Sequence, residues 1–180
     1  MIGAGQEPSA ETPVALDEVK AYLRVTQDDD DALLVGLIRT ASGACERFLG
    51  QVLMVREAEE DVPVSSDWRR LSLTPVAAIE GLASVSDEGD VTALPVTDYA
   101  IDIDANGDGW VRVMGGQAGR IRVNYTAGIA TGWNGVPEPL RQGIVRLVTH
   151  LFVHRDDAEE GAPPAAVAAL WRPWRRMRLT

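Results

Sequence analysis

The chain has 180 residues, of which 46% are hydrophobic and 24% charged. These fractions are typical of a folded globular protein and exclude a disordered or fibrous chain. The net charge of −10 argues against general nucleic-acid binding, because neutralising phosphates requires a basic face. No apolar run approaches the roughly 20 residues that cross a bilayer, and the N-terminus lacks the pattern of a signal peptide. We therefore expect a protein of the cytoplasm that contacts no membrane.

The first 50 residues predict an arm followed by two helices. Residues 1–13 are small, polar and proline-marked, which is typical of a flexible arm. Leu16, Val19 and Leu23 have helical spacing and predict a short helix. A longer apolar stripe over residues 33–49 predicts a second helix, which we expect to end at Gly50.

Two features of the second helix invite a chemical interpretation. Four consecutive aspartates, residues 28–31, resemble a metal site, but a helix cap with dipole complement explains them more simply. Cys45 is the only cysteine, so the chain has no internal disulfide and no cysteine-based zinc cluster. Its place on the apolar stripe predicts a small buried hydrophobic side chain and no reactive nucleophile.

Residues 51–128 have the composition of short strands. Runs rich in Val, Ile and Leu alternate with Pro, Gly, Asp and Asn. Ile121, Val123 and Tyr125 fall on one side of a period-two segment, which predicts a half-buried strand. Five or six such strands predict a small antiparallel sheet inserted between helices.

One loop in this region resembles a calcium site. Asp104, Asn106 and Asp108 imitate the start of an EF-hand loop, but its twelfth position is Gly115, which cannot supply the bidentate carboxylate. Asn-Gly and Asp-Gly are also strong hairpin-turn dipeptides. The sequence therefore favours a turn and leaves open whether these three side chains bind an ion.

A third helix is predicted from residues 136–139 onward, where proline is tolerated in the first turn. His150 and His154 lie four residues apart on it and could present a zinc-binding face. The glutamate of the H-E-x-x-H motif is missing, however, and only Asp156 and Asp157 follow as further ligands. A packing or dipole role is therefore favoured, and a metal-dependent hydrolase that uses both histidines is an alternative function.

The end of the chain combines aromatic and basic residues. A linker over residues 156–164 precedes a short helix that Pro173 is expected to end. Tryptophan and arginine are the residue types that most often carry interface energy, and arginine grips carboxylates and phosphates. We therefore predict a docking tail, with a nucleic-acid-binding module or a solubilising tail as alternatives. The predicted docking residues are Leu170, Trp171, Arg172, Pro173, Trp174, Arg175, Arg176 and Arg178.

The order of these segments resembles the gp6-like head–tail connector family of tailed phages, including the adaptors of gene transfer agents. Four stretches carry the likeness. They are LDEVKAYLRVTQDDDDALLVGLIRTASGACERFLG, then DYAID with RIRVNYTAG, then VPEPLRQGIVRLVTHLFVHRD, and finally AVAALWRPWRR. Together they cover most of residues 14–176 in the expected order.

The resemblance implies a structural adaptor with no catalytic role, no metal and no cofactor. The adaptor would form a dodecameric ring beneath the portal protein, in the neck of a virion or virus-like particle assembled in the bacterial host cytoplasm. DNA would pass through the lumen without specific binding. The tail would dock to the portal, and the far face would contact a neck, stopper or tail-completion protein. An acidic ring suits this role, because like charge suppresses phosphate binding.

The predicted architecture is α+β. We expect helices from the N- and C-terminal parts to pack together, with the small antiparallel sheet inserted between them and an extended C-terminal tail. A single domain over residues 14–155 would comprise helical residues 14–50, β-rich residues 51–128 and helical residues 136–155. The flexible arm over residues 1–13 would precede this domain, and the linker and tail over residues 156–180 would follow it.

Overall fold

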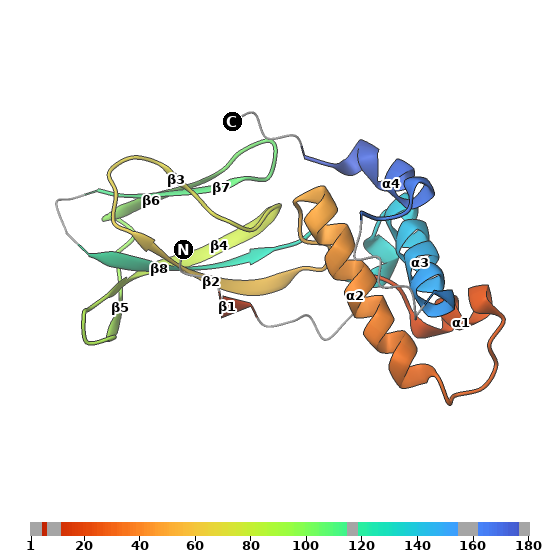
Figure 1. The fold of residues 1–180 in the computed structure, drawn as a ribbon. Helices are drawn as coiled ribbons and strands as arrows, with labels where there is room; N and C mark the ends of the chain where they lie inside the picture. The colour runs from red at the N-terminus through yellow and green to blue at the C-terminus, as the bar shows by residue number, and fades with distance from the viewer. Residues whose placement is uncertain (1–4, 7–11, 115–118, 155–161, 177–180) are drawn as a thin grey trace. The chain divides into compact units, whose positions relative to one another are not determined.

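The computed structural model describes residues 5–6, 12–114, 119–154 and 162–176. It divides into two compact units, one formed by residues 1–9 and 55–128 and the other by residues 10–54 and 129–180. The first unit is built of strands and the second of helices, which confirms the predicted α+β class (Figure 1). The flexible arm expected at the N-terminus lies mostly outside the described residues, but Gly5–Gln6 forms strand β1. The single domain predicted over residues 14–155 stays a prediction.

The helical unit joins both ends of the chain. Its helices are α1 (Leu16–Leu23), α2 (Asp31–Leu49), α3 (Glu138–Val153) and α4 (Ala165–Trp171), with 3-10 turns η1 (Trp133–Gly135) and η2 (Arg172–Trp174). Helix α3 packs against both α2 and α4, so the predicted packing of N- and C-terminal helices is confirmed. None of the described helices is long and apolar enough to span a membrane.

Helix α2 ends where the sequence predicts. Gly50 has a φ of 67°, a left-handed conformation that glycine adopts without strain, and its N–H donates to the Glu46 carbonyl at 2.8 Å. Cys45 is buried on the core face of this helix, and burial raises the pKa of its thiol well above the ordinary value. Cys45 therefore packs as a small hydrophobic side chain, as predicted.

The start of α2 differs from the prediction. Asp30 occupies the N-cap position but makes no side-chain capping bond, so the cap interpretation is wrong. Instead, Lys20 Nζ on α1 contacts Asp28 Oδ1 and Asp31 Oδ1, each at 2.7 Å. Hydrogen bonds to these carboxylates raise the pKa of Lys20 to about 12. Asp28 and Asp31 therefore tie α2 to α1 through Lys20, while Asp31 still complements the helix dipole.

The described strands of this unit form two antiparallel sheets, so the single sheet expected from the sequence is corrected in this respect. The first has the order β1-β2-β8-β4-β5 and the second the order β3-β7-β6. The bounds are β2 (Arg56–Pro63), β3 (Arg69–Arg70), β4 (Val76–Val85), β5 (Val91–Ala93), β6 (Tyr99–Ile103), β7 (Gly109–Val113) and β8 (Arg120–Ala127). Ile121, Val123 and Tyr125 of β8 are buried, as their alternation predicts. They share a core with Val111 and Val113 of β7, so side chains from both sheets fill it.

The EF-hand-like loop is a hairpin turn between β6 and β7, as predicted. Gly107 has a φ of 75°, and its N–H donates to the Asp104 carbonyl at 2.8 Å. The Asp104 carboxylate accepts the N–H groups of Asn106 and Asp108 through Oδ1, and the indole N–H of Trp110 through Oδ2 at 3.2 Å. The carboxylate at the head of the loop therefore closes the turn upon itself.

Candidate functional site: the C-terminal docking segment

Helix α4 and turn η2 position the predicted docking residues. Helix α4 ends at Trp171, two residues before Pro173, and the chain continues as the 3-10 turn η2. Proline fits this turn because a 3-10 helix leaves its first N–H groups without partners. Leu170 is half-buried against the helical core, and Arg178 lies outside the described residues.

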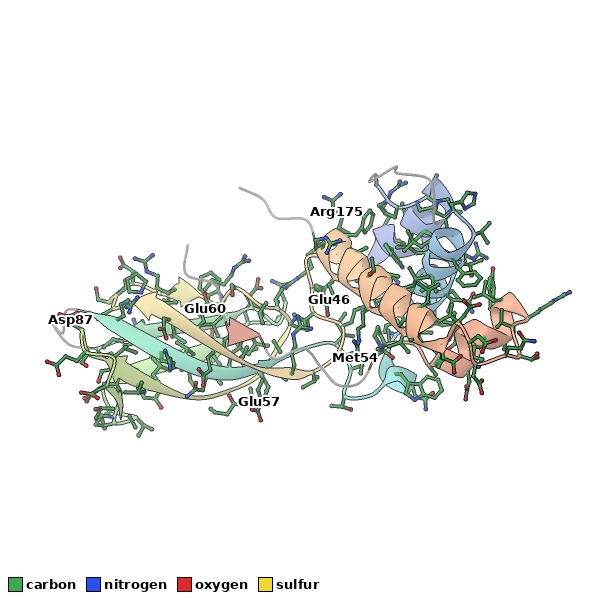
Figure 2. The ribbon with its side chains drawn as sticks, turned by 60° about the horizontal axis from the view of Figure 1, so that its bottom comes forward. Glu46, Met54, Glu57, Glu60, Asp87 and Arg175 are labelled. Carbon is green, nitrogen blue, oxygen red and sulfur yellow. The ribbon has the colours of Figure 1, made fainter. Side chains whose placement is uncertain are left out.

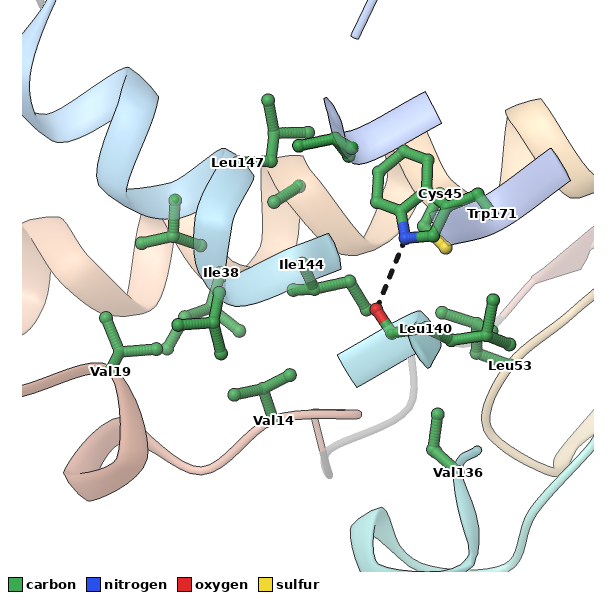
Figure 3. Packing of buried hydrophobic residues seen from close by; sticks show 14 of the residues in the cluster. Val14, Val19, Ile38, Cys45, Leu53, Val136, Leu140, Ile144, Leu147 and Trp171 are labelled. Atoms are coloured by element: carbon green, nitrogen blue, oxygen red, sulfur yellow. Dashed lines mark hydrogen bonds between the residues drawn. The ribbon is translucent and has the colours of Figure 1, made fainter. Parts of the chain in front are cut away.

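Trp171 is part of the chain's own core. Its side chain is 0% exposed, its indole Nε1 donates to the Leu140 carbonyl at 3.3 Å, and its ring centre lies 5.7 Å from that of Phe48 (Figure 3). A tryptophan buried in this way holds the start of the tail to the helices. The structure therefore separates the two tail tryptophans that the sequence had grouped together.

Gly143 of α3 makes room for this tryptophan. A Cβ at position 143 would overlap the indole Nε1 of Trp171 and would lie 2.8 Å from its Cδ1 and Cε2 atoms. The sequence pattern alone did not single out Gly143. The available signal was a glycine inside the otherwise strong apolar stripe of α3, which marks a close approach in many helices.

The residues after Trp171 turn back across the end of α2. The Arg176 N–H donates to the Leu49 carbonyl at 3.0 Å, and Gln51 Nε2 donates to the Trp174 carbonyl at 2.7 Å. The Arg175 guanidinium lies 5.5 Å from the ring centre of Phe48. Figure 2 labels Arg175 beside the end of α2. Since the last carbonyls of a helix lack partners within the helix, the tail satisfies one of them.

The side chains of this segment face solvent although its backbone is held. Trp174 is 39% exposed, and Arg172, Pro173 and Arg175 are also exposed. In the part of the chain that the structure describes, neither Arg172 nor Arg175 forms an ion pair. An exposed indole flanked by guanidinium groups suits a partner surface with carboxylates beside an apolar pocket.

The histidine pair gives the alternative enzymatic function little support. His150 and His154 are exposed, their ring centres lie 4.4 Å apart, and His154 Nδ1 is 2.9 Å from the His150 carbonyl oxygen. Asp156 and Asp157 fall outside the described residues. Over the described ranges, no group of three or more His, Cys, Asp or Glu side chains is placed to hold a metal ion.

The fold is shared with solved structures over the whole chain. The chain is similar to a protein in the "Neck of empty GTA particle computed with C6 symmetry", with a TM-score of 0.81, 23% identity, and coverage of 99% of this chain and 98% of that one. Proteins in the virion of a native gene transfer agent particle and in the neck of a native GTA particle computed with C12 symmetry give TM-scores of 0.76 and 0.72, with the same identity and coverage. These similarities define a common α+β fold.

A family model matches part of the sequence. Residues 13–85 match the model of the phage gp6-like head-tail connector protein family. This match confirms the resemblance predicted from the sequence. No curated protein matches the chain significantly.

Proposed function

We propose that this protein is a structural head–tail connector of a tailed phage or gene transfer agent. The observation that carries the proposal is the agreement between the connector-family match over residues 13–85 and the whole-chain likeness to particle neck proteins. The protein acts as an adaptor in the neck, where DNA passes through a ring and neck or tail proteins assemble onto it. Its work is mechanical and requires no catalytic group or cofactor.

The ring is proposed to contain twelve copies beneath the portal protein. A neck structure computed with C12 symmetry supports this number. Closed rings arise when one surface of a subunit binds a different surface of the next subunit and the rotation closes. The net charge of −10 suits a ring through which DNA slides, because phosphates are repelled by an acidic surface.

The tail is proposed to attach the ring to the portal, with two separate roles within it. Trp171 anchors the segment in the helical core, while the exposed Arg172, Trp174 and Arg175 contact the portal. Leu170, Pro173, Arg176 and Arg178 complete the docking segment. Because hydrogen bonds already hold the backbone of this segment, binding costs little further backbone entropy, which favours affinity.

The test mixes the purified protein with purified portal protein and measures complex mass by mass photometry. We expect a portal-bound species for the wild-type protein and its loss for the triple variant R172A/W174A/R175A. The double variant R39A/R146A removes two exposed arginines elsewhere on the helical unit and serves as the control. No portal-bound species with wild-type protein would contradict the connector function. A triple variant that binds like wild type would contradict only the docking role of the tail.

A further inference from the structure

Charge is distributed unevenly within the strand unit. Residues 55–128 contain 13 acidic residues and 6 arginines, so this segment carries −7 of the total charge of −10. Three of the six arginines nevertheless gather on neighbouring strands. Arg69 and Arg70 of β3 pair in register with Val111 and Trp110 of β7, and Arg112 follows on β7.

An exposed tryptophan lies among these arginines. Trp68 is 40% exposed, and the Arg112 guanidinium lies 4.7 Å from its ring centre. Arg112 Nε is buried and has no hydrogen-bond partner among the described residues. Such a stacked tryptophan–arginine pair is the type of surface feature that most often dominates an interface. Arg69 pairs with the buried Val111, so its side chain leaves the sheet on the opposite face from that of Arg112. We call Trp68 and Arg112 the Trp68–Arg112 patch.

The charge of this patch is not neutralised within the described ranges. Arg70 is paired with Asp108 at 3.4 Å, but Arg112 forms no ion pair there. Asp67 and Asp102 are exposed acids on the neighbouring positions, and no ion pair joins them to these arginines. The patch therefore offers one guanidinium group, stacked on an indole, to an external carboxylate.

The strand unit also carries a group of exposed acidic side chains, which lies in its other sheet. The turn between β4 and β5 carries exposed Asp87, Glu88 and Asp90. Ser86 holds the turn closed, since its N–H donates to the Asp90 carbonyl at 2.9 Å and its hydroxyl accepts the Asp90 N–H at 3.0 Å. Figure 2 labels Asp87 at the end of the strand unit. We call Asp87, Glu88 and Asp90 the acidic turn.

We propose that the Trp68–Arg112 patch of one copy binds the acidic turn of the next copy in the ring. This inference rests on the proposed ring-forming function and names one of its subunit interfaces. Strands β3 and β5 are edge strands of different sheets, so each copy carries a donor surface and an acceptor surface at separate places. That is the requirement for a head-to-tail ring contact. Opposite charge selects the correct neighbour, because like charges brought together cost several kcal/mol.

Two charge reversals test the contact without altering the core. The patch variant is R112E, and the turn variant is D87R/E88R. Each variant alone places like charges at every subunit contact, so we expect at least about a tenfold loss of ring on the portal by mass photometry. An equimolar mixture restores opposite charges at every contact when the two variants alternate, so we expect rings to return. An even number of copies permits this alternation.

Matched variants control for charge and folding. E57R/E80R makes the same charge change as the turn variant at exposed positions of β2 and β4, and R39E matches the patch variant on the helical unit. Both are expected to assemble like wild type, and circular dichroism establishes that all variants are folded.

Several outcomes would overturn the inference. Normal assembly of either reversal variant alone, or no recovery in the mixture, would show that this contact does not exist while leaving the connector function intact. Normal rings of the patch variant that lose DNA retention would assign the patch to DNA instead. A wild-type protein that forms no portal-bound ring would remove the connector function and this interface together.

Discussion

At the scale of single residues, Gly143 and Trp171 form a matched pair in the helical core. Glycine inside a helix ordinarily costs stability relative to alanine, because it loses more backbone freedom on folding. At position 143 this cost is offset by the space that the indole of Trp171 occupies. Gly36 of α2 has no such role, since a Cβ there would meet nothing within 4 Å.

The two glycines should therefore respond in opposite directions to the same substitution. We expect Gly143→Ala to lower the free energy of unfolding by about 1–3 kcal/mol, as an overpacked core does. Gly36→Ala should raise it by about 0.5–1 kcal/mol through helix propensity. Urea unfolding followed by circular dichroism measures both, and a neutral or stabilising Gly143→Ala would contradict the packing described for Trp171.

Tyr125 is a second residue whose role depends on its surroundings. Its hydroxyl donates to Glu60 Oε2 at 3.0 Å, and the same oxygen accepts the N–H and hydroxyl of Ser72 at 2.9 and 2.7 Å. Burial, together with the adjacent Glu60 carboxylate, raises the pKa of Tyr125 to about 12. This network joins β2 and β8 to the segment that follows β3.

Removing the hydroxyl should weaken this network. We expect Tyr125→Phe to lower the free energy of unfolding by about 1–3 kcal/mol, whereas Tyr22→Phe, at an exposed position of α1, should change it by less than about 0.5 kcal/mol. Since the folded pKa of Tyr125 lies above 10, the wild type should lose this contribution as the pH rises from 10 through 12. Unfolding measured across that range tests the sign, because Tyr125→Phe should lack this part of the pH dependence.

At the scale of elements, α4 and η2 divide the tail into an anchor and a contact surface. Trp171 closes the helical core from α4, and the hydrogen bonds from Arg176 and Gln51 hold the following residues on the end of α2. A truncation that begins at Trp171 would remove the anchor together with the docking residues. Single substitutions are therefore the sharper test of the tail.

The two tryptophans should separate stability from binding. We expect Trp171→Ala to lower the free energy of unfolding by about 3–5 kcal/mol, because it leaves a large cavity in the core. Trp174→Ala should cost less than about 1 kcal/mol and should instead reduce portal binding. Thermal unfolding and mass photometry with portal give the two measurements, and equal stability losses would contradict the division of the tail.

At the scale of the whole molecule, residues 55–128 of the strand unit are inserted between two segments of the helical unit. The chain leaves the helical unit after Met54 and returns at Ile129, where the N–H groups of Ile129 and Ala130 donate to the Leu53 carbonyl at 3.1 and 3.0 Å. The two chain segments on either side of residues 55–128 are thus already joined by backbone hydrogen bonds. Each unit also has its own cluster of buried residues.

This arrangement permits a direct test of domain organisation. We expect a shortened protein, in which a Gly-Ser linker replaces residues 55–128, to fold with a cooperative helical melt, because its core residues are all retained. Circular dichroism against temperature measures the transition. A shortened protein that stays unfolded would show that both units fold only together, as the predicted single domain requires.

The sequence by itself determined the features that depend on near neighbours along the chain. The preferences of a few consecutive residues account for three such features. They are the end of α2 at Gly50, the burial of alternate residues Ile121, Val123 and Tyr125, and the turn at Gly107. The positions of the main helices and the α+β class follow from the same local periodicity.

Only the tertiary structure decided the features that join distant residues. The sequence did not predict that Lys20 pairs with Asp28 and Asp31 at the start of α2. Nor did it predict the division of the strands into two sheets or the burial of Trp171. Trp171 and its acceptor Leu140 are 31 positions apart in the sequence. Local patterns show that a side chain is apolar, but burial depends on which distant surface folds against it, and for Trp171 the absence of a side chain at Gly143 made that surface available.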